Sequence, residues 1–305
     1  MDVMESAAKA LDFMAEDRRA MRWRKILRKL LENKGAVFGL IMVFGVIFCA
    51  VLAPVISPHD PIFQDVEKRL IPPMGQKGAD PDYPLGTDHL GRDIVSRLIY
   101  GARISIVVSI SAVALSAFLG TLIGLLSGFY GGKVDNIFMR IADVQLAFPF
   151  ILLAIAIIAV LGPDLQNIII TMAITGWVIY ARVVRAEVLS LREKEFITSV
   201  KALGGSSGRI IFRHLFPNVI PPIIVIITLE MARMIIMEAA LSFLGLGIQP
   251  PTPTWGGMLA DGRVYLITSW WLATFPGLVI MLVVLGINLL GNWLRDMLDP
   301  RLTQL

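Results

Sequence analysis

Long uncharged stretches constrain this chain more than any other feature of its sequence. Five windows of 17 to 30 residues contain no Asp, Glu, Lys or Arg: 36–56, 104–130, 144–162, 165–181 and 264–293. A sixth stretch, residues 219–246, is apolar except for three charged side chains. A hydrocarbon core about 30 Å thick needs about 20 apolar residues per helix. Each stretch is therefore a candidate membrane span.

The overall composition agrees with several membrane spans. Of the 305 residues, 56% are hydrophobic and 17% are charged, whereas a soluble domain has about 25% charged residues. Hydrocarbon admits only α-helices or closed β-barrels, and these windows lack the two-residue alternation of barrel strands. We therefore predict an all-α integral membrane protein with six transmembrane helices.

The distribution of cations predicts the orientation of the chain. With the N-terminus inside, the inward segments hold 20 Lys and Arg residues and the outward segments hold 7. Lys and Arg near span ends are retained on the cytoplasmic side, so both termini are predicted to be cytoplasmic. The lipid bilayer accounts for the net charge of +4, and no nucleic-acid partner is expected.

The predicted spans divide the chain into five segments. These are a cytoplasmic basic amphipathic arm over 1–34, a first transmembrane helix over 35–57, an extracytoplasmic loop with an interfacial helix over 58–103, a core of five transmembrane helices over 104–293, and a cytoplasmic tail over 294–305. Within the core, a cytoplasmic loop covers about 186–217 and an extracytoplasmic loop covers about 247–270.

The cytoplasmic loop contains a charged, glycine-interrupted island, VLSLREKEFITSVKALGGSSGRIIFRHLFP over 188–217. Apolar residues recur at helical spacing, break at Gly204 and Gly205, and resume before Pro217. We predict two short helices that meet at a bend and serve as a docking element. Elsewhere, Gly131, Gly132 and Lys133 lack the earlier glycine and the following Ser or Thr of a phosphate loop. No nucleotide or other cofactor is therefore expected on this chain.

Two outward segments carry residues that allow more than one interpretation. Asp88, His89 and Asp93 are a weak metal-site pattern, because they mix ligand types without a second histidine cluster. The favoured interpretation is that Thr87 or Asp88 caps the interfacial helix. That helix would present an apolar face made of Ile94, Val95, Leu98 and Ile99. Three outward tryptophans belong either to a membrane-interface belt or to a surface that receives a partner: Trp255, Trp270 and Trp271.

The predicted fifth span contains the charged residues Glu230, Arg233 and Glu238. Glu230 and Arg233 can pair on one helix face, and charges in hydrocarbon normally face a bundle interior or a wet cavity. A buried ion pair and a pathway-lining role both remain open. In the second span, small residues recur every four positions and predict close helix packing, within the chain or against a partner: Ser116, Gly120, Gly124 and Gly128. Prolines in or at the mouths of spans predict bent helices: Pro149, Pro221, Pro222 and Pro276.

The charged island resembles the cytoplasmic signature of ABC importer permeases, which reads EAA, three residues, Gly, nine residues, then Ile-x-Leu-Pro. Gly204 and Pro217 keep its thirteen-residue spacing. At the EAA positions stand Thr198, Ser199 and Val200, and at the Ile and Leu positions stand His214 and Phe216. Four further segments are similar to the second permease subunit of dipeptide and oligopeptide importers: LGTDHLGRDIVSRLIYGARIS, GGKVDNIFMRIAD, QPPTPTWGGML and NLLGNWLRDMLDPRL.

This resemblance implies the type I importer architecture, with a coupling helix in the cytoplasmic loop, in the inner or plasma membrane of a prokaryote. It implies a homologous permease as partner, two cytoplasmic ATPases that bind ATP and Mg, and an extracytoplasmic peptide-binding protein. The chain itself would be a transport subunit and not an enzyme. The residues implied in coupling to the ATPase are Thr198, Ser199, Val200, Lys201, Ala202, Leu203, Gly204, Gly205, Arg209, His214 and Pro217.

Other functions are weighed against a peptide importer. The same type of importer serves nickel chelates, glutathione or oligosaccharides. A secondary transporter coupled to an ion gradient would use Glu230 and Glu238 as proton-linked carboxylates. A receptor or scaffold without transport would have no use for charged, proline-bearing spans.

Overall fold

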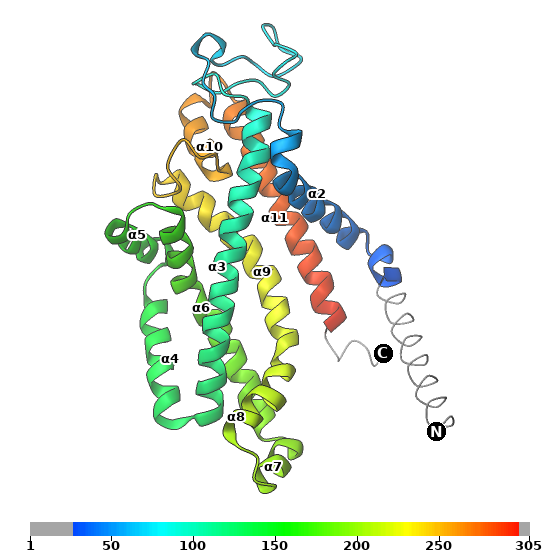
Figure 1. Ribbon diagram of the computed structural model, residues 1–305, viewed down its shortest axis with the longest axis vertical. Coiled ribbons are helices and arrows are strands. Elements are labelled where there is room, and N and C mark those ends of the chain that lie inside the picture. Colours follow the sequence, from blue (N-terminus) through cyan, green and yellow to red (C-terminus); the bar gives the residue numbers. More distant parts are fainter. Residues whose placement is uncertain (1–26, 299–305) are drawn as a thin grey trace, which may run out of the picture.

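The computed structural model describes residues 27–298, and that part of the chain is an elongated helical bundle (Figure 1). Its main helices are α2 (Lys34–Ile56), α3 (Ile94–Tyr130), α4 (Gly132–Ala147), α5 (Phe150–Leu161), α6 (Leu165–Arg192), α7 (Glu195–Ala202), α8 (Ser207–Arg209), α9 (Phe216–Phe243), α10 (Trp255–Gly262) and α11 (Trp271–Leu298). We call the end that carries α7 the inner end and the end that carries residues 57–93 the outer end, after the charge distribution. The predicted arm over 1–34 lies mostly outside the described residues, as does the tail beyond residue 298.

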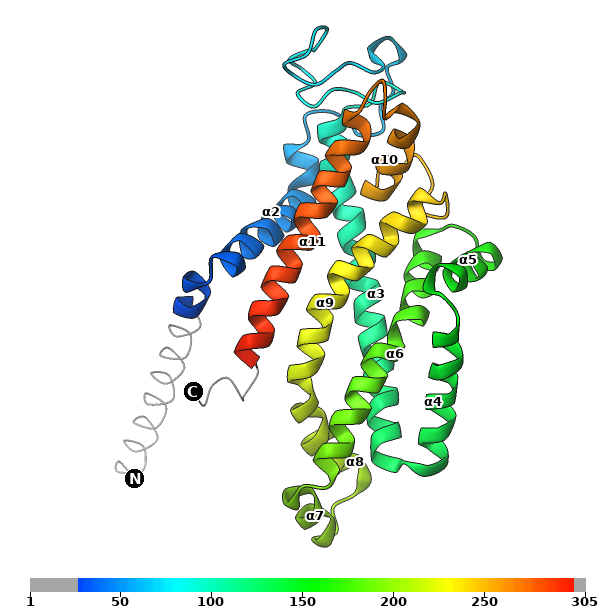
Figure 2. The same ribbon diagram turned by 180° about the vertical axis from the view of Figure 1, so that it is seen from behind.

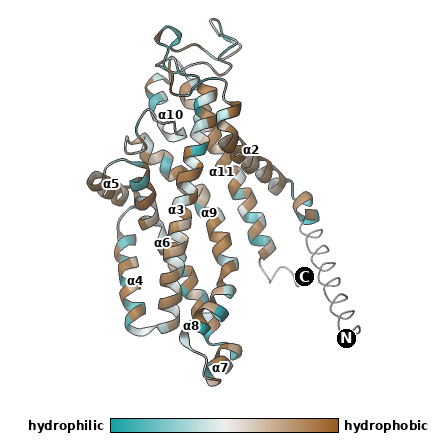
Figure 3. Ribbon diagram, viewed as in Figure 1, coloured by the Kyte–Doolittle hydropathy of each residue, from teal (hydrophilic) through white to brown (hydrophobic). Residues whose placement is uncertain are grey.

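The membrane-spanning character of the chain follows from its long apolar helices. Five of them are long and apolar enough to cross a membrane, and the α4 and α5 pair makes a sixth if it is one broken span. Figure 3 shows their middle portions as mostly hydrophobic, with hydrophilic residues gathered around α8 and at the outer end. The predicted all-α membrane fold is confirmed.

The third predicted span, 144–162, is not one straight helix. Helix α4 ends at Ala147, α5 begins at Phe150, and the two are bent by 96°. Pro149 explains the break, because its ring fixes φ and its nitrogen has no N–H to donate to the preceding turn. Figures 1 and 2 show α5 projecting sideways from the bundle while α4 runs beside α3 and α6.

The predicted interfacial helix before the second span is wrong as a separate element. Helix α3 runs without a break for 37 residues from Ile94. Asp93 is its cap and accepts hydrogen bonds from the backbone N–H groups of Val95 and Ser96, which are among the orphan donors of a helix start. The predicted caps, Thr87 and Asp88, lie before this helix and have other partners.

Two other predicted spans have different ends. The fourth continues past residue 181, because α6 extends into the charged residues up to Arg192. The sixth begins at Trp271 instead of 264 and reaches Leu298. The outer loop between α9 and α11 is not all loop, since it contains α10, capped by the side chain of Thr254.

The small residues of α3 pack within this chain. A side chain at Gly120 would meet the carbonyl oxygen of Trp177 at 2.3 Å, and one at Gly124 would meet that of Ala181 at 2.7 Å. Ser116 hydrogen-bonds the carbonyl oxygen of Ala173 at 3.3 Å. The predicted close approach is therefore between α3 and α6, and it is the most extensive helix contact in the described chain.

Residues 57–93 form an irregular layer over the outer end of the bundle (Figure 1). Gly91 has a φ of +76°, and a Cβ there would lie 1.7 Å from the carbonyl oxygen of Asp65. Only glycine permits that approach of two backbone segments. The indole of Trp271 donates to the carbonyl oxygen of Thr87 at 3.2 Å, which ties this layer to α11.

Candidate functional site

The predicted bend at the inner end is the C-terminal cap of α7. The N–H of Gly205 donates to the carbonyl of Val200 at 2.9 Å, and the N–H of Gly204 donates to that of Lys201 at 3.0 Å. This is the Schellman arrangement, in which the residue after the cap adopts a left-handed conformation. Gly204 fills that position with a φ of +78°. The predicted break at Gly204 and Gly205 thus ends a helix and turns the chain.

One face of α7 is anchored in the bundle and the other is exposed. Ile197 is fully buried in an apolar cluster with residues of α6 and α9, such as Val188 and Val219. Burial of such a side chain stabilises the fold by about 1.5–3 kcal/mol. The preceding residue Phe196 is exposed, and Leu203, in the turn after α7, is 88% exposed. Helix α7 therefore presents an apolar tip on a firmly held base.

The other half of the island is not a second separate helix. Helix α8 passes through a π-helical segment, Ile210–Leu215, directly into α9. Such wide turns are rare and frequently lie at functional sites. Residues 188–192 of the island belong to α6. The structure places the candidate coupling residues as follows: Thr198, Ser199, Val200, Lys201 and Ala202 in α7, Leu203, Gly204 and Gly205 in the turn, Arg209 in α8, His214 in the π-helical segment, and Pro217 in the first turn of α9.

The charged side chains of α9 form two separate groups. Arg233 Nη1 lies 3.3 Å from Glu230 Oε1, so these two residues pair as their three-residue spacing allows, and the pairing leaves a pathway-lining role open. Glu238, five residues further on, is buried and accepts hydrogen bonds from Ser242 at 2.9 Å and from Ser105 of α3 at 3.2 Å. Glu238 therefore links α9 to α3 and does not share the ion pair.

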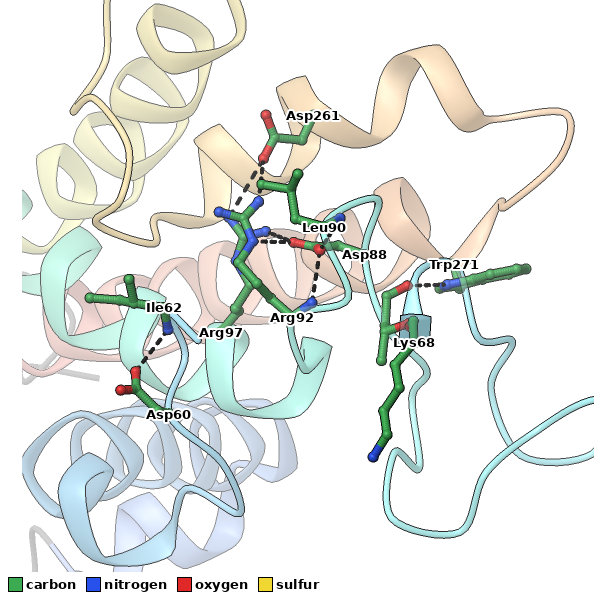
Figure 4. Close-up of polar contacts among 10 residues, drawn as sticks. Asp60, Ile62, Lys68, Asp88, Leu90, Arg92, Arg97, Asp261 and Trp271 are labelled. Carbon is green, nitrogen blue, oxygen red and sulfur yellow. Dashed lines mark hydrogen bonds and ion pairs between the residues drawn. The ribbon is translucent and has the colours of Figure 1, made fainter. Parts of the chain in front are cut away.

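Four charged residues that sequence reasoning did not combine join the outer layer to the bundle (Figure 4). The carboxylate of Asp88 pairs with Arg92 at 2.6 Å and also with Arg97. Both arginines lie 3.5 Å from Asp261 of α10. Burial raises the pKa of Asp88, but Arg97, Arg92 and two backbone N–H groups lower it more, so the pKa lies below the usual value for an aspartate. No local pattern reveals this cluster, because Asp261 is distant in sequence.

The other two residues of the considered metal pattern have separate partners. His89 stacks on Tyr265, with ring centroids 5.6 Å apart. Asp93 accepts from the Ser96 hydroxyl at 2.5 Å in addition to capping α3. With Asp88 held by two arginines, the three side chains serve three different local structures.

The outer tryptophans do not form one surface. Trp255 is buried between α3 and α9, and its indole donates to the carbonyl of Leu98 at 2.9 Å. Trp271 is also buried, whereas Trp270 is exposed. For Trp255 and Trp271, the predictions of an interface belt and of a partner surface are therefore both wrong. These two side chains hold α10 and the outer layer in place.

Sequence reasoning also missed the polar bonds between α4 and α6. Arg185 binds Asp135, with 2.6 Å between Nη2 and Oδ2, and Arg182 binds Asp143 at 2.5 Å. These pairs are 50 and 39 residues apart in sequence. A local window that counts charges cannot detect them.

Comparison with known proteins gives two family matches. Residues 120–304 match the family described as "Binding-protein-dependent transport system inner membrane component". Residues 22–73 match "N-terminal TM domain of oligopeptide transport permease C". The first match alone covers more than half of the chain.

Individual relatives cover nearly the full length of this chain. A dipeptide transport system permease of Alkalihalophilus pseudofirmus is 46% identical over 280 residues, which are 92% of this chain and 90% of that protein. A di/tripeptide transport system permease of Pseudomonas aeruginosa is 44% identical, with 92% of each chain covered. A dipeptide transport system permease of Escherichia coli K12 is 44% identical over 90% of this chain and 91% of the relative.

Proposed function

The chain belongs to the family of binding-protein-dependent transport system inner membrane components, and from that membership we propose that it is a permease subunit of an ATP-driven peptide importer. The observation that carries the proposal is the 42 to 46% identity to dipeptide permeases over at least 90% of the chain. Nickel chelates, glutathione and oligosaccharides are less favoured substrates, because the relatives are described as dipeptide or di/tripeptide permeases. An ion-coupled secondary transporter is likewise not favoured.

The permease would work as one member of a larger assembly. A homologous permease would complete the pathway across the inner membrane, an extracytoplasmic binding protein would deliver the peptide, and two cytoplasmic ATPases would supply the energy. ATP and Mg would be held by the ATPases. Both termini of the chain would be cytoplasmic, in agreement with the excess of Lys and Arg in the inward segments.

The exposed tip of α7 supports a coupling role for the inner loop. Helix-in-groove recognition uses an amphipathic helix whose free apolar residues enter a groove on the partner. Phe196 and Leu203 are such residues, and Ile197 packs α7 against residues of α6 and α9. Movement of an ATPase would therefore displace α7 together with the inner ends of two long helices.

The coupling role predicts that Gly204→Leu abolishes ATP-driven uptake while the subunit still inserts and assembles. No atom lies within 4 Å of a Cβ at Gly204, so the change acts through its φ of +78°, which disfavours other residues by roughly 1–2 kcal/mol. The measurement is uptake of a labelled dipeptide by vesicles containing the full complex, together with co-purification of the ATPases. Gly205→Leu should have the same effect, because its Cβ would lie 2.6 Å from Val200.

Gly132→Leu is the matched control for that experiment. Gly132 also has positive φ and open space around its Cβ, but it is the first residue of α4, outside the coupling loop. Uptake by this control variant should persist. Normal uptake by both Gly204→Leu and Gly205→Leu would refute the coupling role, and absence of dipeptide uptake by the wild-type complex would refute the peptide substrate.

A further inference from the structure

Arg233 combines a charge, a mid-membrane depth and exposure to the surroundings of this chain. Its side chain is 43% exposed, whereas that of its partner Glu230 is 6% exposed. It lies 10 residues before the outer end of α9 at Phe243, which is about 15 Å along a helix axis. With the outer boundary of a hydrocarbon core about 30 Å thick taken at Phe243, Arg233 lies near the middle of that core.

Lipid is an unfavourable neighbour for this side chain. An arginine at the centre of a bilayer costs at least about 2.5–3.5 kcal/mol, and such residues face a bundle interior or a water-filled cavity. Long arginines near span ends can extend to the headgroups, but both ends of α9 are distant from Arg233. The exposed face of α9 at Arg233 is therefore covered by protein or by water.

The break between α4 and α5 marks the same face independently. The Arg233 guanidinium lies 5.9 Å from the ring centroid of Phe150, the first residue of α5. The neighbouring non-helical residues Phe148 and Pro149 are exposed, Phe148 by 56%. Non-helical backbone at membrane depth is tolerated only inside protein or along a water-filled cavity. The charge of Arg233 and the non-helical backbone at Phe148 and Pro149 thus each argue that lipid does not cover this face of α9.

The guanidinium retains binding capacity on this face. Of the three guanidinium nitrogens of Arg233, only Nη1 donates a hydrogen bond to another described residue. It donates to the two carboxylate oxygens of Glu230, at 3.3 and 3.4 Å. A guanidinium has five donors arranged in a fork that matches a carboxylate. The remaining nitrogens can therefore hold a second carboxylate in a bidentate manner while Glu230 supports the arginine from the buried side.

We propose that Arg233 lines the translocation pathway and binds the C-terminal carboxylate of a peptide as it passes. This assignment rests on the proposed function, because it takes the substrate to be a peptide. Peptides of different sequence share this carboxylate, so one cation on the wall can serve all of them.

Labelling with a thiol reagent tests the location separately from transport. Arg233→Cys and Met234→Cys are made in a Cys49→Ser background, because Cys49 is the single cysteine of the chain. In the assembled complex, a charged membrane-impermeant methanethiosulfonate reagent should modify Cys at position 233. Met234 is its buried neighbour, so Cys at position 234 should stay unmodified. Equal protection at the two positions would overturn the pathway location.

Transport by charge variants then tests carboxylate binding. Arg233→Gln should lower dipeptide uptake at least about 10-fold, the effect expected for losing a charge-assisted hydrogen bond, and Arg233→Lys should lower it less. Modification of Arg233→Cys by an aminoethyl methanethiosulfonate reagent should restore uptake because it returns a cation. Modification by a sulfonatoethyl reagent should not. Equal rescue by both reagents would show that volume and not charge matters.

A double variant separates carboxylate binding from a purely structural ion pair. If Arg233 only neutralises Glu230, the double variant Glu230→Gln, Arg233→Gln contains no buried unpaired charge and should regain the uptake that Arg233→Gln lost. If Arg233 binds the peptide, the double variant stays as defective as Arg233→Gln. Regained uptake would overturn the proposal. A wild-type complex that takes up no peptide would refute the proposed function, whereas labelling at position 233 would still report the wall of a pathway.

Discussion

Asp88 shows how much of the outer end depends on one side chain. It is buried, it pairs with Arg92 and Arg97, and it accepts hydrogen bonds from the backbone N–H groups of Leu90 and Arg92. Both arginines also form an ion pair with Asp261 on α10. One carboxylate thus closes its own loop and joins that loop, α3 and α10.

We predict that Asp88→Asn loosens the outer layer. The substitution keeps the shape but leaves two buried arginines with only Asp261, and breaking a buried pair costs about 3–5 kcal/mol. Limited proteolysis in detergent should show faster cleavage within residues 57–93, while the inner loop keeps its protection. Asp60→Asn is the control, because Asp60 is exposed and bonds only its own turn. Unchanged cleavage of the Asp88 variant would contradict the assigned role.

The same carboxylate predicts an acid sensitivity of the outer layer. Its pKa is lowered on folding, so its stabilising contribution is fully present above about pH 4, the unfolded value. The contribution is lost as the pH falls further, through the lowered folded pKa. Proteolysis by an acid-active protease should therefore accelerate below about pH 4 in the wild-type protein. In Asp88→Asn, this acceleration should be smaller.

The bounds of the helices were predictable where the composition of the sequence determines them. They were mispredicted where a bend or a contact between distant residues determines them. The windows for α2 and α9 came close to the observed bounds, because a run of apolar residues between charges leaves few alternatives. The window 144–162 is long enough for a membrane span, but its composition does not reveal that the chain bends by 96° at Pro149. The end of α6 was missed because Arg182 and Arg185 find partners on α4, and the window treated them as the start of a loop.

The contact between α3 and α6 predicts a strong effect of side-chain size. Gly124→Leu would place its Cβ 2.7 Å from the Ala181 carbonyl oxygen and 2.8 Å from Val184 Cβ. The backbone cannot move aside as a flexible side chain does, so α3 and α6 must separate. We expect this to lower the free energy of unfolding by about 1–3 kcal/mol. Size-exclusion chromatography after heating should show a lower melting temperature. Gly45→Leu in α2 meets nothing within 4 Å and should melt like the wild type.

For the whole molecule, the charge distribution and the fold agree on which ends face opposite sides of the membrane. Residues 57–93 and α7 lie at opposite ends of the bundle (Figures 1 and 2). The two most exposed large apolar residues of those ends are Leu203 and Ile267, at 88% and 99% exposure. They are suitable sites for topology labels because neither side chain is packed within the described part of this chain.

We expect Ile267→Cys to react with an impermeant thiol reagent added outside intact cells, and Leu203→Cys, in a subunit produced without the ATPases, to react only after the membrane is opened. Both variants are made in the Cys49→Ser background. The result follows from the retention of Lys and Arg on the cytoplasmic side. The reverse pattern would invert the predicted orientation and contradict the proposed contact of α7 with cytoplasmic ATPases.

Two helices are long enough to carry a movement from one end of the molecule to the other. Helix α3 and the continuous helix over Ser207–Phe243 each contain 37 residues, which makes each about 55 Å long. A rod of that length tilted by about 5° moves its far end by about 5 Å. The inner end of one rod follows α7 directly, and its outer end contacts α10. Under the coupling role proposed for α7, a small displacement of its tip would therefore move the opposite end of this helix by several ångströms.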